Sequence, residues 1–110
     1  MARPTEKTRI EFLQETLNSS PDNAFVRYGL AMELASSAEP QLAWQHFEYL
    51  LAHHPEYSAT YYQAGKFLAN QGRREEAKAV LTKGIEVTGR QGNLHAQSEL
   101  QTALADLGGA

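Results

Sequence analysis

The stretch from Tyr61 to Ile85 reads YYQAGKFLANQGRREEAKAVLTKGI, and its pattern of small and large apolar residues decides the fold. These residues recur at helical spacing on either side of an interruption at Gln71 and Gly72. They are Ala64, Gly65 and Leu68 before the interruption, and Ala77, Val80, Leu81 and Ile85 after it. Gly72 suits the left-handed residue that ends a helix. The stretch therefore predicts two helices joined by a short turn.

The same pattern occurs 34 residues earlier in the chain. When the sequence is shifted by this period, small residues fall on small ones and large residues on large ones. The aligned pairs are Leu17 with Leu51, Pro21 with Pro55, Tyr28 with Tyr62, Leu34 with Leu68, Ala35 with Ala69 and Ala43 with Ala77. A fixed period of about 20–50 residues is typical of repeat proteins. The chain is therefore expected to contain two successive helix-turn-helix units.

Apolar residues at helical spacing also occupy both flanks, from Ile10 to Leu17 and from Ala96 to Leu107. Six helices are expected, so the fold class is all-α. Their expected ranges are 5–18, 23–36, 40–53, 58–70, 73–88 and 93–107. Pro40 suits the first turn of its helix, because its missing N–H is not needed there. Asp22 and Ser58 are the expected N-caps of the helices that follow them.

With this spacing the sequence resembles the tetratricopeptide repeat family, whose unit is a helix-turn-helix with a small residue in the first helix and an alanine in the second. In the second unit the resemblance rests on Tyr61, Gly65, Leu68, Gly72, Ala77, Leu81 and Ile85, and in the first on Leu30, Ala31, Leu34, Ala43, Phe47, Leu51 and Pro55. It implies antiparallel helix-turn-helix repeats stacked in a short right-handed solenoid. The implied single domain of residues 1–110 comprises an N-terminal half-repeat helix (5–18), two repeats (24–57 and 58–91) and a C-terminal capping helix (93–107).

Four positions depart from the family pattern. Arg27 stands where the family usually has an aromatic residue, and Gly89 replaces a terminal proline. Leu50 and Gly84 each replace a usual alanine. Repeat families share a fold more closely than a function, so the resemblance predicts architecture better than it predicts a partner.

Composition is that of an ordinary folded domain. The 110 residues are 42% apolar and 21% charged, with a net charge of -3 and no cysteine. Lysines and arginines are scattered, and Arg73-Arg74 is followed directly by Glu75-Glu76, so no basic stripe for nucleic acid is expected. The sequence shows no apolar segment for a membrane, and a cytoplasmic location is expected.

No sequence motif of a known catalytic site is present, and we expect no catalytic residue, no cofactor and no metal. His46 lies two helical turns from His53 and His54, which is too far for one ion without ligands from another element. We expect His53 and His54 to lie in the last turn of a helix, near the negative end of its dipole.

The family lines its concave surface with the first helix of each unit, and this resemblance places seven residues in a groove that binds a partner. They are Phe25, Tyr28, Met32 and Ser36 from the first unit, and Tyr62, Lys66 and Asn70 from the second. Tyrosine and methionine provide adaptable contact area, and Lys66 would favour an acidic residue in the partner. The alternative is that some of these side chains pack in the core against the terminal helices.

The resemblance therefore implies a protein-protein interaction module, a scaffold or adaptor that binds a peptide or protein without turnover. Two alternatives remain open from the sequence. One is a structural repeat module that self-associates, for example as a homodimer. The other is an enzyme or a metal-dependent regulator built around the histidines.

Overall fold

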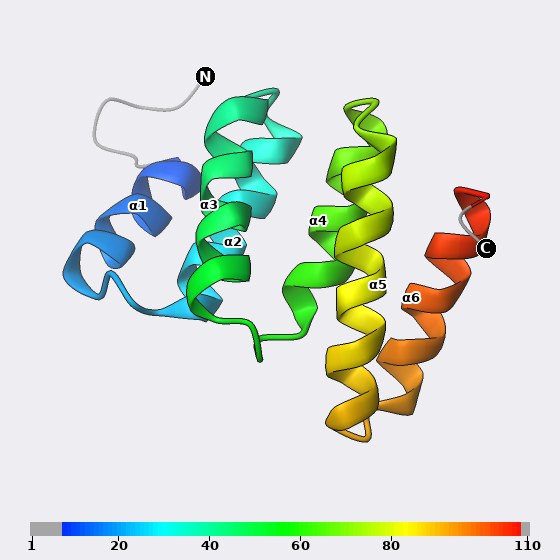
Figure 1. Cartoon of the computed structure of the whole chain (residues 1–110). Coiled ribbons are helices and arrows are strands. Elements are labelled where there is room, and N and C mark those ends of the chain that lie inside the picture. The colour runs from blue at the N-terminus through cyan, green and yellow to red at the C-terminus, as the bar shows by residue number, and fades with distance from the viewer. Residues whose placement is uncertain (1–7, 109–110) are drawn as a thin grey trace. The chain divides into compact units, whose positions relative to one another are not determined.

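The computed structural model describes residues 8–108, and this part of the chain folds into six helices with no strand (Figure 1). The helices are α1 (Arg9–Ser19), α2 (Ala24–Ser36), α3 (Pro40–His53), α4 (Ala59–Asn70), α5 (Arg74–Arg90) and α6 (Leu94–Asp106). They form two compact units. The first, which extends to His54, holds α1, α2 and α3, and the second begins at Pro55 and holds α4, α5 and α6. The predicted all-α helix-turn-helix architecture is confirmed.

The first helix begins later than the sequence suggested. Residues 5–7 of the expected range lie outside the described residues, and Thr8 is the N-cap of α1. The Thr8 hydroxyl accepts the Glu11 amide at 3.1 Å, and the Glu11 carboxylate accepts the Thr8 amide at 3.0 Å. This reciprocal capping box satisfies two amides that have no partner within the helix.

Of the two predicted N-caps, Ser58 is correct in position and Asp22 is wrong. Asn23, not Asp22, caps α2, because its side-chain oxygen accepts the Val26 amide at 3.0 Å. Ser58 occupies the N-cap position of α4, but its backbone is already helical and its side chain makes no capping hydrogen bond. Pro40 lies in the first turn of α3, as predicted.

Left-handed residues end the first helix of both repeats. Gly72 follows α4 with φ +76°, and the amide of the next residue donates to the Leu68 carbonyl at 2.9 Å. This confirms the predicted role of Gly72. In the first repeat, Ala38 occupies the same position with φ +57°, and the Glu39 amide donates to the Leu34 carbonyl at 3.0 Å. The turn geometry is therefore repeated even where the glycine is not.

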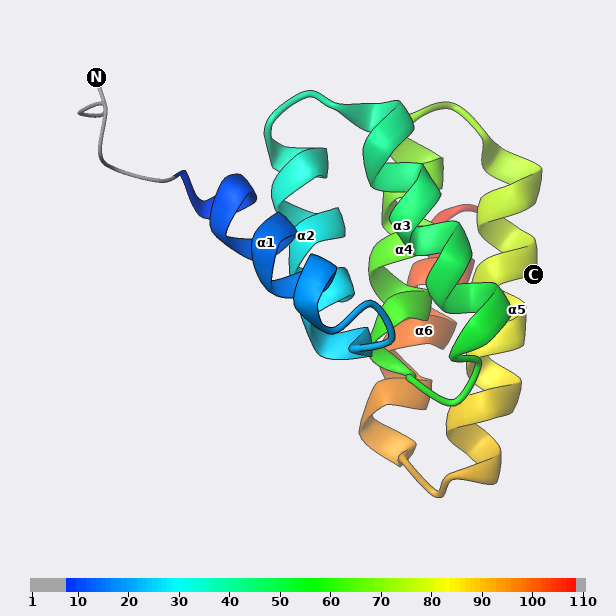
Figure 2. The same ribbon diagram turned by 90° about the vertical axis from the view of Figure 1, so that its left-hand side faces the viewer.

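In the first unit, α2 packs against both α3 and α1, and Figure 2 shows α1 lying along α2. The small residues predicted for the helix crossing, Ala31 and Ala43, are completely buried. The rest of the buried apolar core comprises Leu17, Leu30, Leu34, Phe47 and Leu50. Leu50 thus fills a position where the family usually has alanine.

In the second unit, α5 contacts both α4 and α6 (Figure 1). Gly65 and Ala77 are buried at the α4–α5 crossing, as predicted. A Cβ atom on Gly65 would lie 2.5 Å from Leu81 Cδ2, so the two helices approach too closely there for a larger residue. The buried apolar side chains are Tyr61, Ala64, Phe67, Leu68, Ala77, Leu81, Val87 and Leu100.

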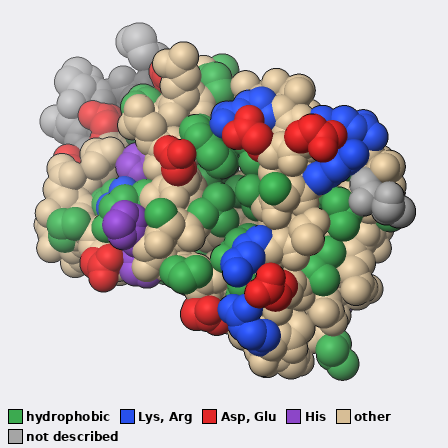
Figure 3. Space-filling view, in the orientation of Figure 1, with side chains coloured by type: hydrophobic (Ala, Val, Ile, Leu, Met, Phe, Trp, Pro, Cys, Tyr) green, Lys and Arg blue, Asp and Glu red, His purple; other side chains and the backbone are tan. Residues whose placement is uncertain are grey.

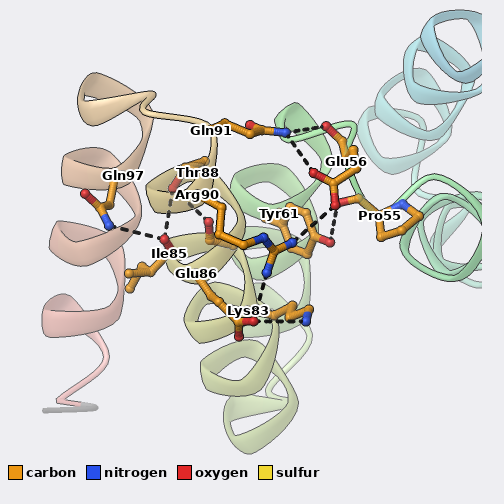
Figure 4. Close-up of polar contacts among 11 residues, drawn as sticks. Pro55, Glu56, Tyr61, Lys83, Ile85, Glu86, Thr88, Arg90, Gln91 and Gln97 are labelled. Atoms are coloured by element: carbon orange, nitrogen blue, oxygen red, sulfur yellow. Dashed lines mark hydrogen bonds and ion pairs between the residues drawn. The ribbon is translucent and has the colours of Figure 1, made fainter.

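Polar contacts hold the C-terminal half of α5 in place (Figure 4). The Arg90 guanidinium donates to the Glu86 carboxylate at 2.9 Å and to the Glu56 carboxylate at 3.2 Å. On the other side of α5, the side-chain amide of Gln97 donates to the Ile85 backbone carbonyl at 3.3 Å. This last contact orients α6 against α5.

Candidate functional site

A hollow of about 410 Å³ lies between α4 and α6 in the second unit. From α4 it is lined by Tyr62, Gly65, Lys66, Ala69 and Asn70, and from α6 and the residue after it by His95, Ser98, Glu99, Thr102, Ala103, Asp106 and Leu107. Leu81 of α5 completes the lining. The hollow thus has two helical walls and an apolar floor.

The α4 wall brings together three of the residues predicted from the sequence. Tyr62, Lys66 and Asn70 follow one another at four-residue spacing, which places them on one stripe of the helix. Tyr62 is half-buried, whereas Lys66 and Asn70 are exposed. The Lys66 Nζ lies 5.3 Å from the centroid of the Tyr62 ring, within the range of a cation–π interaction. The Lys66 ammonium group therefore lies beside the Tyr62 ring on the α4 side of the hollow.

The α6 wall was not predicted from the sequence. His95, Glu99, Thr102 and Asp106 recur at spacings of four, three and four residues, so their side chains share one face of the helix. The His95 Nε2 lies 3.6 Å from a Glu99 carboxylate oxygen. This polar stripe opposite the buried Leu100 could have been read from the sequence as a solvent face, but nothing there linked it to α4.

The floor of the hollow is apolar because Leu81 is buried beneath it and Gly65 carries no side chain. Ala69, Ala103 and Leu107 are half-buried around this floor. An apolar floor between walls that carry charged side chains is complementary in chemistry to an amphipathic segment rather than to a purely polar one.

The other four predicted residues belong to the first unit and do not line this hollow. Tyr28 and Met32 are half-buried, and Ser36 is exposed. Phe25 is 73% exposed, which is unusual for so large an apolar side chain. The structure therefore brings together Tyr62, Lys66 and Asn70 but gives Phe25, Tyr28, Met32 and Ser36 a place in a separate unit.

A second hollow, of about 350 Å³, lies in the first unit. Its lining includes the apolar side chains of Ile10, Leu34 and Leu42 and reaches His46. The His46 Nδ1 lies 3.1 Å from an Arg27 guanidinium nitrogen. Burial, and then the Arg27 charge, lowers the pKa of His46.

His53 and His54 also have protein partners, and Figure 3 shows histidine side chains close together on one part of the drawn face. The His53 ring lies 4.3 Å from the Tyr49 ring between centroids, and the His54 Nε2 lies 2.9 Å from an Asp22 carboxylate oxygen. His53 lies in the last turn of α3, as predicted, whereas His54 is the C-cap residue that follows it. Within the described residues, no group of three or more histidine, aspartate or glutamate side chains could hold a metal ion.

Charged side chains on the face drawn in Figure 3 lie in mixed groups, with Lys and Arg beside Asp and Glu. In the second unit, Arg73 lies 2.7 Å from Glu76 and Lys83 lies 3.5 Å from Glu86. Among residues 8–108, no helix is both long and apolar enough to cross a membrane.

Comparisons with known proteins agree with this geometry. No family model matches the chain. A TPR repeat-containing protein of Pseudomonas aeruginosa is 27% identical over 98 residues, which cover 89% of this chain and 93% of that protein. The crystal structure of a tetratricopeptide repeat domain protein from Salinibacter ruber is 34% identical, with a TM-score of 0.75, and the match covers 80% of this chain and 98% of that one. A solution structure of a Bordetella parapertussis protein has a TM-score of 0.80 at 27% identity, covering 94% of this chain and 90% of that one.

Two-helix units in a 34-residue register, with small residues at each helix crossing, define a helical repeat protein. The chain belongs to the tetratricopeptide repeat family, as its match to the Salinibacter ruber domain shows. Members of this family serve generally as protein-interaction modules.

Proposed function

We propose that this chain is a scaffold or adaptor that binds a segment of a partner protein in the hollow between α4 and α6, without turnover. The observation that carries the proposal is the convergence of Tyr62, Lys66 and Asn70 with the α6 wall around one apolar floor. The family resemblance assigns the same three residues to a binding surface. The first-unit residues Phe25, Tyr28, Met32 and Ser36 are proposed as further contacts of the same partner.

The size and chemistry of the hollow fit a peptide segment. Its volume of about 410 Å³ falls within the range of roughly 300–1,000 Å³ that is usual for binding pockets. Apolar side chains of a helical or extended segment would rest on Leu81 and Ala103, and polar groups would meet Asn70 and Thr102. Such binding needs no reacting group, which is consistent with the interaction role of the family.

Two tryptophan variants on α6 test this proposal. Thr102 lines the hollow, whereas its exposed neighbour Gln101 does not, so Thr102→Trp should fill the hollow and Gln101→Trp should leave it open. The immobilised wild-type chain and both variants are used to capture proteins from a lysate of the source organism, followed by mass spectrometry. We expect partners that bind to the wild type and to Gln101→Trp but not to Thr102→Trp. If all three chains retain the same proteins, with both variants folded by circular dichroism, the hollow is not the binding site.

Self-association is a second candidate, because large apolar side chains of the first unit face solvent. Phe12 and Phe25 are 61% and 73% exposed. Exposed aromatic side chains of this kind often mark contacts with another protein, including a second copy. Sedimentation equilibrium over a range of concentrations tests it: a dimer that Phe25→Ser weakens supports this candidate, and a monomer at all concentrations opposes it.

A further inference from the structure

We propose that the segment bound between α4 and α6 is basic, with Lys or Arg side chains that pair with Glu99 and Asp106 and apolar side chains that rest on the floor. This inference rests on the proposed function, because it names the partner class for the same hollow. It also replaces the expectation of an acidic partner, which depended on Lys66 alone.

The charges that line the hollow are unequal. Glu99 and Asp106 are both exposed on the α6 wall, and Lys66 is the one lysine or arginine among the lining residues. His95 is the remaining titratable side chain of this wall, and its ring lies beside the Glu99 carboxylate. Negative charge therefore exceeds positive charge in the hollow, and complementary charge in a partner is favoured.

Lys66 does not lie among these carboxylates. Its Nζ lies over the Tyr62 ring on the α4 wall, whereas Glu99 and Asp106 belong to the opposite wall. The nearby Arg74 donates a hydrogen bond to the Leu107 carbonyl at the end of α6, and it is not among the residues that line the hollow. Within the described residues, no ion pair joins Lys66 or Arg74 to either carboxylate. A basic ligand that enters the hollow would therefore meet Asp106 directly and would meet Glu99 beside the His95 ring, which lies 3.6 Å from it.

The spacing of the two carboxylates suits a helical segment. Glu99 and Asp106 are two helical turns apart, or about 10.5 Å along the axis of α6. A partner helix lying beside α6 would present basic residues at the same spacing, with apolar residues between them directed at Leu81 and Ala103. An amphipathic basic helix meets both requirements.

A library of random 16-residue peptides displayed on phage supplies the probe. The library is selected on the immobilised full chain and, in parallel, on Thr102→Trp. We expect peptides that are enriched on the wild type only, with an excess of Lys and Arg over Asp and Glu. The selected peptides are then synthesised, and their Kd values are measured by fluorescence anisotropy.

Two double variants separate the effect of these carboxylates from that of net charge. Glu99→Gln/Asp106→Asn alters the hollow, and Glu48→Gln/Glu75→Gln alters exposed carboxylates outside it. Each raises the formal net charge of -3 by the same two charges. We expect the first to weaken binding about fivefold or more at 50 mM NaCl and less at 300 mM, and the second to change it less than about twofold.

The outcomes distinguish the two proposals. If peptides discriminate between the wild type and Thr102→Trp but are neutral or acidic, or if both double variants behave alike, the basic partner is contradicted and the binding hollow stands. If no peptide distinguishes the wild type from Thr102→Trp, the binding hollow is contradicted together with this inference.

Discussion

A Cβ atom added to Gly84 would lie 2.5 Å from the Cβ of Tyr61, so α4 and α5 meet at this point with no room for a methyl group. In the first repeat, the corresponding positions hold Arg27 and Leu50, and Leu50 is fully buried. In the second repeat, tyrosine on the first helix and glycine on the second thus occupy the positions that arginine and leucine hold in the first repeat.

Gly84→Ala should therefore destabilise the protein. The methyl group would collide with Tyr61 Cβ and approach Leu100 Cδ1 to 3.1 Å, and overpacking of this kind costs about 1–3 kcal/mol. Gly29→Ala is the control, since its Cβ would meet Leu13 at an ordinary 3.7 Å and helix propensity favours alanine by up to about 1 kcal/mol. Urea unfolding should show opposite effects, and equal stability of the two variants would contradict the close approach.

The turn after α2 offers a stabilising substitution. Ala38 has φ +57°, a conformation that costs a residue with a side chain about 1–2 kcal/mol and costs glycine little. Ala38→Gly should raise the free energy of unfolding by roughly 0.5–1 kcal/mol, after allowance for the greater entropy of glycine in the unfolded chain. Gly72→Ala should do the reverse at the equivalent turn, where φ is +76°. A loss of stability on Ala38→Gly would refute this reading of the turn.

A buried hydroxyl in α4 is a second place for stabilisation. The Thr60 Oγ1 is buried and has no hydrogen-bond partner among the described residues, and the aligned position of the first repeat is Val26. Thr60→Val should stabilise the protein by about 1 kcal/mol, because it removes an unsatisfied polar group. Thr88→Val provides the comparison, since the buried Thr88 hydroxyl donates to the Gly84 carbonyl at 2.8 Å. Thermal unfolding should show a higher Tm for the first variant and no gain for the second; equal shifts would argue against the unsatisfied group.

Stability should fall on mild acidification because of His46. The folded protein lowers the pKa of His46 below 6.5, through burial and the Arg27 charge, so the unfolded chain binds the proton first as the pH falls. The stability that neutral His46 contributes is fully present above pH 6.5. It is lost as the pH falls from 6.5 through the lower pKa that His46 has in the folded protein. His46→Gln should reduce the loss of Tm between pH 7.5 and 5.5, whereas His95→Gln, at an exposed site, should retain it. An unchanged pH dependence in His46→Gln would exclude His46 as its source.

Much of the fold was predictable from the 34-residue register, because helix crossings select residue size at Ala43, Gly65 and Ala77. The positive φ of Ala38 could also have been predicted, because the 34-residue register aligns Ala38 with Gly72. The choice of Asn23 over Asp22 as a cap was not predictable, since both side chains can cap a helix. The contact between the Arg27 guanidinium and the Tyr49 ring, at 3.7 Å, depends on how α2 and α3 pack and has no local sequence signal.

About half of the candidate site could be read from the sequence. Tyr62, Lys66 and Asn70 lie on a helix that the resemblance identified as a binding surface, and periodicity placed them on one face. Glu99 and Asp106 were missed because α6 lies outside the repeat register, so no aligned residue suggested what it faces. Tertiary packing of α6 next to α4 was needed to show that these charges line the same hollow.

The most direct test of the binding hollow is an NMR titration of the ¹⁵N-labelled chain with a peptide selected from the random library. If the partner binds in the hollow, the largest changes in amide chemical shift should cluster on α4 and α6, around Lys66, Glu99 and Thr102. Changes of similar size should be absent from α3, because this helix belongs to the first unit and none of its residues lines the hollow. Saturable binding whose largest changes lie on α1, α2 or α3, with Lys66 and Thr102 unperturbed, would contradict the account.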